Sequence, residues 1–483
     1  MTLAPPRASG RRLIETRPMR NPDASDPGLM AKRGWWLVLL NVLIPGSAQI
    51  LAGRRRLGRF GLGATLVAWL LVIVTLGLAL FARPVLLWLT VGAGWFSAVV
   101  LTVVQVAMVG YVVLWLILTL DAIRLVRLVK VPGPSRFAIP LVALLVFALV
   151  GSGTAYAASA VGSVRSTLGQ VFGNSGPSLP PDDGYYNILL LGADSGEGRD
   201  SMRFDSISVV SVNAESGAVT ITGIPRELPN APFGEGSPML ELYPNGFEGH
   251  SSSTCGWNGW MNHIRNAAQL CREDGGSALY PDAAAHGSEP GIEATKDAAE
   301  GVLGIKIPYY VFVDMQGFAA LIDALGGVDI NVTERLPMGG GPAYPGQSAE
   351  EWAIGWIEPG QQHMNGDTAQ WYARSRYTTS DWDRMKRQRE LQQAILAQFT
   401  PETVLTRFNE VAAAGTALID TDLPQDKLPE FFDLVLKAQK EPVTTIELTP
   451  EFGIDEHEPD YAYVHEMIQQ ALHPPTPTAT PSP

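Results

Sequence analysis

The sequence has few of the residues on which several common kinds of site depend. It holds only 2 cysteines and 7 histidines among 483 residues. No histidines stand in an H-x-x-x-H or H-E-x-x-H pattern, which argues against a zinc site of that kind. A Walker-type phosphate loop is also missing, and the GADSG segment lacks the G-x-S-x-G spacing of many serine hydrolases. P-loop nucleotidases and nucleophile-elbow hydrolases are therefore not expected.

Charge of one sign is scarce in each part of the chain. Residues 1–160 contain 16 Lys and Arg against 4 Asp and Glu, whereas residues 161–483 contain 19 against 44. A basic first third and an acidic remainder indicate two different surroundings. Because an acidic domain repels phosphate backbones, we expect no nucleic-acid partner.

The cysteines, Cys255 and Cys271, both lie in the acidic part. A lone pair in an exported segment can form one disulfide, but two unlinked thiols in a loop fit the spacing equally well. The sequence leaves the choice open.

Long hydrophobic runs are confined to the basic part. Residues 1–33 are polar and basic, and we interpret them as a cytoplasmic segment rather than a cleaved signal peptide. A membrane region follows at 34–160, where several apolar blocks approach or exceed the ~20 residues needed to cross a bilayer. These blocks occupy residues 34–52, 60–82, 85–123 and 137–158.

Basic residues predict how these blocks are threaded. The N-terminus and the loops at 54–59 and 124–136 are rich in arginine and should be cytoplasmic by the positive-inside rule. The block 34–52, broken by Pro45 and Gly46, would then start and end on one side, as a re-entrant or interfacial segment. About three crossings follow; the alternative, with five crossings, would place the arginines at 54–59 outside. In both versions everything after residue 160 should lie outside the cytoplasm.

A transporter is the alternative for such a region. Transporters usually carry functional charges within their spans. Here Arg83 and Asp121 fall at the ends of the apolar blocks and almost no others occur. Anchoring is the favoured role.

The acidic part predicts one folded domain at residues 185–472. The preceding residues, 161–184, are rich in Gly, Pro and Ser and predict a linker. The Pro/Thr-rich residues 473–483 predict a disordered tail. Within the domain, residues 228–290 are rich in Gly, Pro, Ser and Asn and indicate a long loop-bearing insert.

Regular elements return after the insert. Patterns predict helices at 291–303 and 316–325 and strands at 309–313 and 328–332. Residues 334–360 resemble a loop again.

The first chemically loaded stretch runs from Asn187 to Glu227. Strands are predicted at 187–191, 206–212 and 218–224. Open α/β sheets bind ligands at the carboxyl ends of their strands. Two acids and two arginines collect at these strand ends, a combination that suits a divalent cation beside phosphate. They are Asp194, Arg203, Asp205 and Arg226.

The second loaded stretch, Gln370 to Gln393, holds six of the 19 basic residues of the acidic part between Arg374 and Arg389. We expect a strand over QWYARSRY, which would place Arg374 and Arg376 on one face. A helix from about residue 384 would place Arg384 and Gln388 on one face. Such arginine forks can clamp phosphate oxygens.

A solvated helix start, balanced by Asp381 and Asp383, is the alternative for this stretch and has about equal weight.

Taken together, these motifs resemble the LytR–CpsA–Psr family. The resemblance rests on GADS, RFDS, GIPRE, ALGGVDINV and ARSR followed by SDWDRMKRQ, in that order. It is strong over residues 185–400 and weaker to about 470. It implies an α/β fold, with a central mixed sheet flanked by helices in an extracytoplasmic domain that follows the helical membrane region.

The resemblance also implies a function and assigns roles. Members are bacterial membrane-anchored phosphotransferases that move a glycopolymer from a polyprenyl pyrophosphate carrier onto peptidoglycan, with the lipid tail in an apolar pocket. Asp194 and Asp205 match the acids associated with Mg²⁺ (or Mn²⁺). The pyrophosphate-binding residues correspond to Arg203, Arg226, Arg374, Arg376, Arg384 and Gln388. Of these, Arg203, Arg374 and Arg376 join the two acids as candidate catalytic residues.

The chain departs from the family pattern in three places. Glu227 stands where the family usually has Asp, and the loop between Arg376 and Arg384 is shorter than is common. Several apolar segments replace a single membrane span. Two other functions remain open: a polyprenyl-pyrophosphate hydrolase, and a non-catalytic envelope protein that binds lipid or regulates.

Overall fold

The structure is a computed structural model that describes residues 19–172, 176–193, 203–398 and 419–474. The chain divides into two compact units, and the main division falls between Arg165 and Ser166. The predicted tail, residues 473–483, lies almost wholly outside the described residues.

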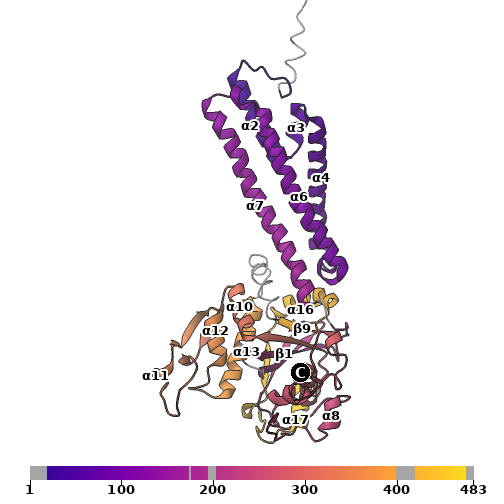
Figure 1. The fold of residues 1–483 in the computed structure, drawn as a ribbon, viewed down its shortest axis with the longest axis vertical. Coiled ribbons are helices and arrows are strands. Elements are labelled where there is room, and N and C mark those ends of the chain that lie inside the picture. Colours follow the sequence, from indigo (N-terminus) through magenta and orange to yellow (C-terminus); the bar gives the residue numbers. More distant parts are fainter. Residues whose placement is uncertain (1–18, 173–175, 194–202, 399–418, 475–483) are drawn as a thin grey trace, which may run out of the picture. The chain divides into compact units, whose positions relative to one another are not determined.

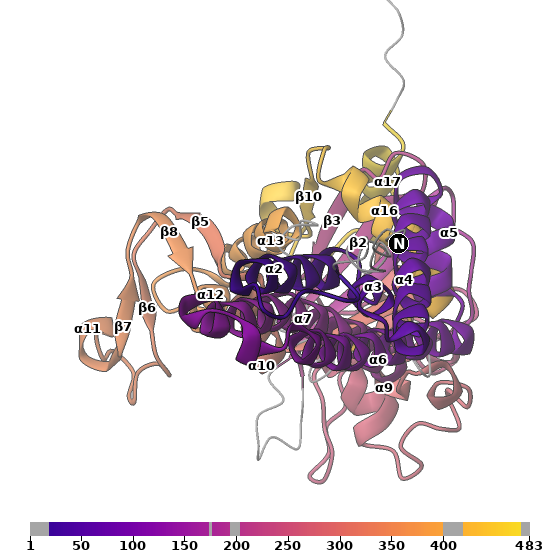
Figure 2. The same ribbon diagram turned by 90° about the horizontal axis from the view of Figure 1, so that it is seen from above.

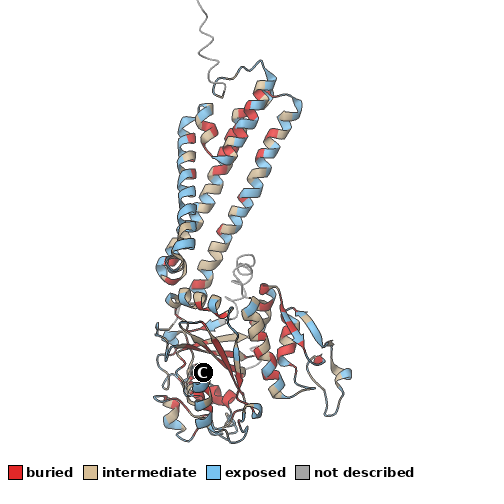
Figure 3. Ribbon diagram, turned by 180° about the vertical axis from the view of Figure 1, so that it is seen from behind, coloured by how far each residue is buried: buried red, intermediate tan, exposed pale blue. Residues whose placement is uncertain are grey.

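The first unit is helical. Among the described residues, three helices are long and apolar enough to cross a membrane, and they correspond to the three predicted crossings. They are α4 (Arg55–Phe81), α6 (Trp95–Val126, continued to Lys130 by a short 3-10 turn) and α7 (Gly133–Val171). Most of their residues are exposed or half-buried (Figure 3), and many of the exposed residues are large and apolar. Helix α7 extends into the first part of the predicted linker, which is therefore helical up to Val171.

The block predicted as a re-entrant or interfacial segment forms two helices, α2 (Pro27–Leu43) and α3 (Ser47–Ala52). The turn between them contains Gly46 at φ +96°, where a Cβ would come within 2.3 Å of the backbone nitrogen of Leu62. Only glycine fits such a close approach. Helix α2 begins earlier than predicted because Asp26 caps its first turn. A short helix, α5 (Arg83–Leu87), follows α4.

The second unit is built on a six-stranded sheet with the order β10-β3-β2-β1-β4-β9. The strands are β1 (Tyr185–Ala193), β2 (Phe204–Asn213), β3 (Val219–Ile224), β4 (Tyr309–Asp314), β9 (Ile419–Thr421) and β10 (Thr444–Glu447). Strands β1 and β4 are parallel, as are β3 and β10, and the other neighbours are antiparallel. The sheet is thus mixed, and the predicted strands are confirmed: β1, β2 and β4 are slightly longer than predicted, and β3 begins one residue later.

Helices cover both faces of this sheet (Figures 1 and 3). On one face, Leu189 and Val209 pack with α9 (Pro290–Leu303) and α17 (Tyr461–Leu472) in the largest buried cluster. On the other face, Tyr186 packs with Leu434 of α16 (Leu428–Ala438). The strand pairing brings the ends of β1, β3 and β4 and the start of β2 to one edge of the sheet, as the first loaded stretch predicted.

The insert at 228–290 contains only short helices, among them α8 (Pro238–Leu242) and the 3-10 turn η3 (Met261–His263). Cys255 and Cys271 form a disulfide within it, with 5.6 Å between their Cα atoms. This settles the question that the sequence left open.

A helical group lies beside the sheet: α10 (Met315–Leu325), α12 (Gly366–Arg374) and α13 (Asp381–Gln398) (Figure 1). Two small antiparallel pairs extend from it (Figure 2). They are β5 (Val328–Val332) with β8 (Gly360–Met364), and β6 (Leu336–Met338) with β7 (Gly355–Ile357), next to α11 (Ala349–Trp352). The segment predicted as loop at 334–360 thus contains a short hairpin.

The predicted strand over QWYARSRY is wrong, because most of this segment belongs to helix α12. The Asn365 side chain accepts a hydrogen bond from the Thr368 amide (2.9 Å) and caps the helix. Ala369, Tyr372 and Ala373 are buried at helical spacing. The helix ends at Arg374, since Ser375 is extended. Arg374 and Arg376 therefore come from a helix end and the turn after it. The helix predicted from about residue 384 is confirmed as α13.

Candidate active site

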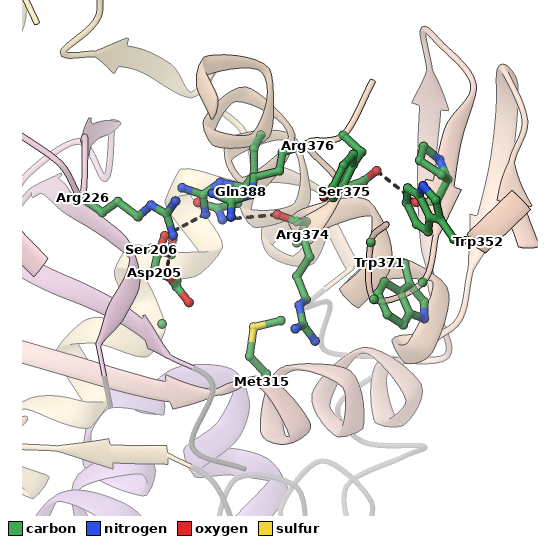
Figure 4. A pocket seen from close by; sticks show the side chains of 18 residues that line it. Asp205, Ser206, Arg226, Met315, Trp352, Trp371, Arg374, Ser375, Arg376 and Gln388 are labelled. Atoms are coloured by element: carbon green, nitrogen blue, oxygen red, sulfur yellow. Dashed lines mark hydrogen bonds and ion pairs between the residues drawn. The ribbon is translucent and has the colours of Figure 1, made fainter. Parts of the chain in front are cut away.

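A pocket of about 260 Å³ lies where the sheet edge meets the helical group (Figure 4). The sheet contributes Gly192 from β1, Asp205 and Ser206 from β2, and Arg226 from just after β3. The helical group contributes the start of α10, the end of α12 and the start of α13. Residues more than 180 positions apart in the sequence thus share one cavity.

Most of the predicted site residues line this pocket: Asp205, Arg226, Arg374, Arg376, Arg384 and Gln388. Asp194 lies outside the described residues. Arg203 is exposed and lines a separate groove instead.

Asp381 is the centre of the pocket's charge network, a role that the sequence did not reveal. Arg384 binds it through two atoms, Nε to Oδ1 (3.0 Å) and Nη2 to Oδ2 (2.9 Å). Arg226 and Arg376 approach Oδ1 to 3.6 Å and 3.8 Å. Burial would raise the pKa of Asp381, but Arg384, Arg226 and Arg376 outweigh it and hold the pKa below its ordinary value. Asp381, which the alternative interpretation treated as a surface charge that balances a solvated helix start, is therefore part of the site.

Arg226 is fixed by three carboxylates. Its Nη1 donates to Asp205 Oδ1 at 2.6 Å, and Nη2 lies 3.1 Å from Glu227 Oε1. Its side chain is 14% exposed. Burial opposes the charge, but Asp381, Asp205 and Glu227 more than offset this and raise the pKa of Arg226. The Glu that departs from the family pattern thus still contacts the arginine before it.

Arg384 and Gln388 join α13 to its neighbours. Arg384 Nη1 donates to the backbone oxygen of Asp205 (2.8 Å), which fastens the start of α13 to β2. One turn later, the Gln388 amide donates to the backbone oxygen of Ala373 on α12 (3.3 Å). Both side chains line the pocket, as their spacing predicted.

Arg374 and Arg376 are the exposed arginines of the pocket. The Arg374 guanidinium lies 5.5 Å from the centre of the Trp371 ring, a cation–π distance. Figure 4 shows Arg374 and Met315 pointing toward one another across the opening. Because these two arginines are not buried in the protein, they can reorient toward an anion at low cost.

Part of the pocket lining is apolar and was not predicted; we call this part the apolar wall. Met315, Trp352, Trp371 and Tyr377 line it, and the Trp352 and Tyr377 rings lie 4.9 Å apart. The glycine run 339–341 borders the same wall. The available signal was a group of aromatic residues flanking a glycine-rich loop, which alone is too common to assign.

The carboxylates near the pocket are the groups that could hold a divalent cation. Within the described residues, no group of three or more His, Cys, Asp or Glu could hold a metal ion. Asp205 is a 43% exposed carboxylate at the pocket, and Asp194 follows β1 outside the described residues. Mg²⁺ is commonly held by one or two carboxylates together with substrate phosphates and water, so Asp205 fits such a site.

The site thus combines four guanidinium groups, an exposed carboxylate and an apolar wall within one small cavity. Arginine forks bind phosphate oxygens bidentately and remain charged. This combination suits a diphosphate attached to an apolar chain.

The fold and site define a chain of the LytR–CpsA–Psr class. The family model described as LytR_cpsA_psr matches residues 161–473, so the chain belongs to that family.

Two curated relatives are similar to this chain. It is 26% identical to the polyisoprenyl-teichoic acid–peptidoglycan teichoic acid transferase TagU of Bacillus cereus, over 67% of this chain and 91% of that protein. It is 25% identical to biofilm regulatory protein A of Streptococcus mutans, over 60% of this chain. The match spans 63% of that relative, less than two thirds of its length.

Solved structures of similar shape include a Streptococcus agalactiae protein, gbs0355, with 21% identity and a TM-score of 0.41 over 60% of this chain and 88% of that one. TagV of B. subtilis has 19% identity and a TM-score of 0.39, over 60% and 97%.

Proposed function

We propose that this protein is a membrane-anchored phosphotransferase that moves a glycopolymer from a polyprenyl pyrophosphate carrier onto peptidoglycan. The observation that carries the proposal is the pocket in which Arg226, Arg374, Arg376 and Arg384 converge beside an apolar wall. Family membership and the name of the TagU relative support it.

Each part of the donor has a complementary part of the pocket. The diphosphate would lie among the guanidinium groups, which stabilise the charge that develops during transfer. The apolar wall at Met315, Trp352 and Trp371 would hold the first isoprene units of the carrier. Arg226 and Arg384 are held in place by protein carboxylates, so little reorganisation is needed when the substrate binds.

The chemical step would be attack of a peptidoglycan hydroxyl on the phosphorus next to the glycan. A new O–P bond forms, the bond from that phosphorus to the bridging oxygen breaks, and polyprenyl phosphate leaves with the electron pair. We assign the acceptance of the hydroxyl proton to Asp205, the exposed carboxylate of the pocket. Arg374 and Arg376 would bind the departing phosphate.

A divalent cation, Mg²⁺ or Mn²⁺, is part of the proposal and would be held by Asp205 together with Asp194. Bound there, it would neutralise charge on the pyrophosphate oxygens. Addition of a chelator should abolish transfer, and Mg²⁺ should restore it.

The three apolar helices support anchoring of the protein in the membrane. We further propose the multi-pass arrangement, with the unit after Arg165 outside the cytoplasm, since the basic loops at 54–59 and 124–136 favour that orientation. The disulfide agrees with an oxidising compartment.

The test uses the full chain in detergent with a polyprenyl pyrophosphate-linked glycan and purified peptidoglycan. Arg374→Ala and Arg376→Ala should each abolish transfer while the thermal midpoint stays unchanged, because both side chains are exposed. Wild-type rates in these variants would refute the assignment. Release of the glycan phosphate into water, whether or not peptidoglycan is present, would identify a hydrolase. An Asp205→Asn variant with full cellular function would identify a non-catalytic envelope protein.

A further inference from the structure

A second, larger hollow lies in the insert, and we call it the insert groove. Its volume is about 820 Å³, and it is lined by Arg203 and by side chains and backbone from residues 249–260 and His263. The lining is rich in neutral polar groups, such as Ser251, Ser252 and Asn258, and includes Trp257 and Trp260. Arg203 is the single Lys, Arg, Asp or Glu among the described residues that line it.

Backbone hydrogen bonds and a disulfide define the shape of the groove. His250 and Trp257 pair through two backbone hydrogen bonds (2.8 and 2.9 Å), and their rings lie 4.8 Å apart. The disulfide between Cys255 and Cys271 joins the tip of this turn to the helical part of the insert. Trp260 remains 36% exposed, although it is one of the largest apolar side chains.

His263 supplies an unused hydrogen-bond donor at the groove. Its side chain is 5% exposed, and Nδ1 accepts a hydrogen bond from the Asn258 amide (3.1 Å). In the neutral ring the proton is then on Nε2, which has no hydrogen-bond partner among the described residues. Burial, followed by the charge of Arg203, lowers the pKa of His263 and favours this neutral form. Buried polar groups are normally paired, so the residue that forms this part of the groove lining has an unsatisfied polar atom.

The groove and the charged pocket share one segment of backbone. The Asn262 amide donates to the carbonyl of Arg226 (2.9 Å), and the Met261 amide to that of Leu228 (3.0 Å). Arg203 lines the groove, while Asp205, two residues later, lines the pocket. The backbone that carries Arg226 and Asp205 therefore also connects to the groove.

We propose that the insert groove binds the glycan chain of the peptidoglycan acceptor. This proposal rests on the proposed function and names the subsite for its second substrate. Tryptophan rings with neutral hydroxyl and amide groups suit sugar rings, whose apolar faces stack and whose hydroxyls hydrogen-bond. The near absence of charge in the lining makes it unsuitable for a diphosphate.

The acceptor, rather than the donor glycan, is the occupant that this arrangement favours. The donor is already fixed by its diphosphate and its apolar tail. The acceptor has neither, and its hydroxyl must still be held close to the reacting phosphorus. A site joined through backbone hydrogen bonds to Arg226 supplies that positioning.

The experiment compares Trp260→Ala with the conservative Trp260→Phe and with a matched control, Tyr463→Ala. Tyr463 is an aromatic residue of similar exposure (44%) on α17. The full chain in detergent is mixed with insoluble peptidoglycan sacculi stripped of attached polymers, and retention is measured by sedimentation. Donor binding is measured separately, both with polyprenyl pyrophosphate and with its glycan-linked form.

Trp260→Ala should weaken sacculus retention and raise the acceptor KM by about tenfold, the size expected when an anchoring tryptophan is removed. Trp260→Phe should recover most of the loss, and Tyr463→Ala should match the wild type. Polyprenyl pyrophosphate binding should be the same in all four proteins.

Two results would overturn the inference. One is that Trp260→Ala retains sacculi as well as the wild type does, and the other is that Trp260→Ala loses binding of the glycan-linked donor while its sacculus retention is normal. The proposed function fails separately. A wild type that binds sacculi through Trp260 but transfers nothing would leave the groove assignment standing and refute the transfer. If transfer occurred at the wild-type rate without Trp260, the proposed function would stand and the groove assignment would be refuted.

Discussion

The charged pocket and the insert groove differ in their lining residues and in the ligands that they suit. The pocket has four arginines and an apolar wall, and its lining comes from the sheet edge, the helical group and the neighbouring segment that contains β6 and α11. The groove has two tryptophans and neutral polar groups, drawn almost entirely from residues 249–263 and closed by a disulfide. One is assembled by the fold, and the other by a loop.

The two sites are also held rigid by different interactions. In the pocket, charge holds the arginines: Arg226 and Arg384 are paired with Asp205 and Asp381 before any substrate arrives. In the groove, a covalent bond and a few backbone hydrogen bonds hold the aromatic side chains. Changes in charge should therefore affect the pocket, and changes in covalent structure should affect the groove.

Among the changes that separate the pocket from the groove, Arg384→Ala should have the largest effect, and that effect should be confined to the pocket. It removes a phosphate ligand and also releases Asp381 and the Asp205 backbone. Transfer should fall by about 10³-fold, in the range seen when a preorganised charge-stabilising group is lost. Sacculus retention should stay normal. The control is Arg335→Ala, an exposed arginine paired with Glu358. Equal losses in the two variants would remove the distinction between pocket and surface arginines.

The pocket and the groove also differ in how well they could be predicted from the sequence. Strand ends that meet at one edge could be predicted, because buried apolar runs announce strands and the acids and arginines follow them directly. Arg384 and Gln388 could be placed on one face by helical spacing alone. These residues depend on local patterns that survive folding.

The rest depended on contacts that local patterns do not encode. The stretch QWYARSRY has aromatic residues that favour strand, but the Asn365 cap and burial of Tyr372 and Ala373 make it a helix. Asp381 has two arginine partners nearby in the sequence, but its contact with Arg226, 155 positions away, depends on the fold and could not be predicted. The groove escaped notice since serine, glycine and asparagine merely indicate loop, and its disulfide could not be decided from spacing.

Removal of the disulfide should produce the next largest effect, this time in the groove. Closing a loop of this size, between cysteines 16 positions apart in the sequence, stabilises the folded state by about 3 kcal/mol. A Cys255→Ser/Cys271→Ser double variant should melt at lower temperature and lose sacculus retention. Polyprenyl pyrophosphate binding, measured at a temperature where the variant is folded, should persist. A parallel loss of both binding activities would show that the pocket depends on the loop.

Asp381→Asn tests the charge network through its dependence on pH. The folded-state pKa of Asp381 is depressed, so its contribution to stability is present above its ordinary value of 3.8 and is lost as the pH falls through the lower folded value. The variant should be about 1 kcal/mol less stable than wild type at neutral pH, because a side chain that is 31% exposed is partly screened by water. The gap should close below pH 3.8 in denaturant unfolding curves.

The matched control for Asp381→Asn is Asp329→Asn, whose partner is the exposed His363. At neutral pH this variant should change stability by less than about 0.5 kcal/mol. A gap for Asp381→Asn that persists unchanged into acid would show that its ionised form does not hold the three arginines.

Met315→Ala should have the smallest effect and sets the apolar wall of the pocket against the aromatic lining of the groove. Loss of this half-buried side chain should weaken the binding of polyprenyl pyrophosphate by about fivefold, roughly 1 kcal/mol of apolar contact. Binding of inorganic pyrophosphate should not change, because it reaches only the arginines. Met467→Ala, a partly buried methionine of α17 that packs on the main core, is the control for loss of packing alone. If Met315→Ala reduced sacculus retention and spared the lipid, the two sites would have exchanged roles, since the apolar wall would then serve the acceptor.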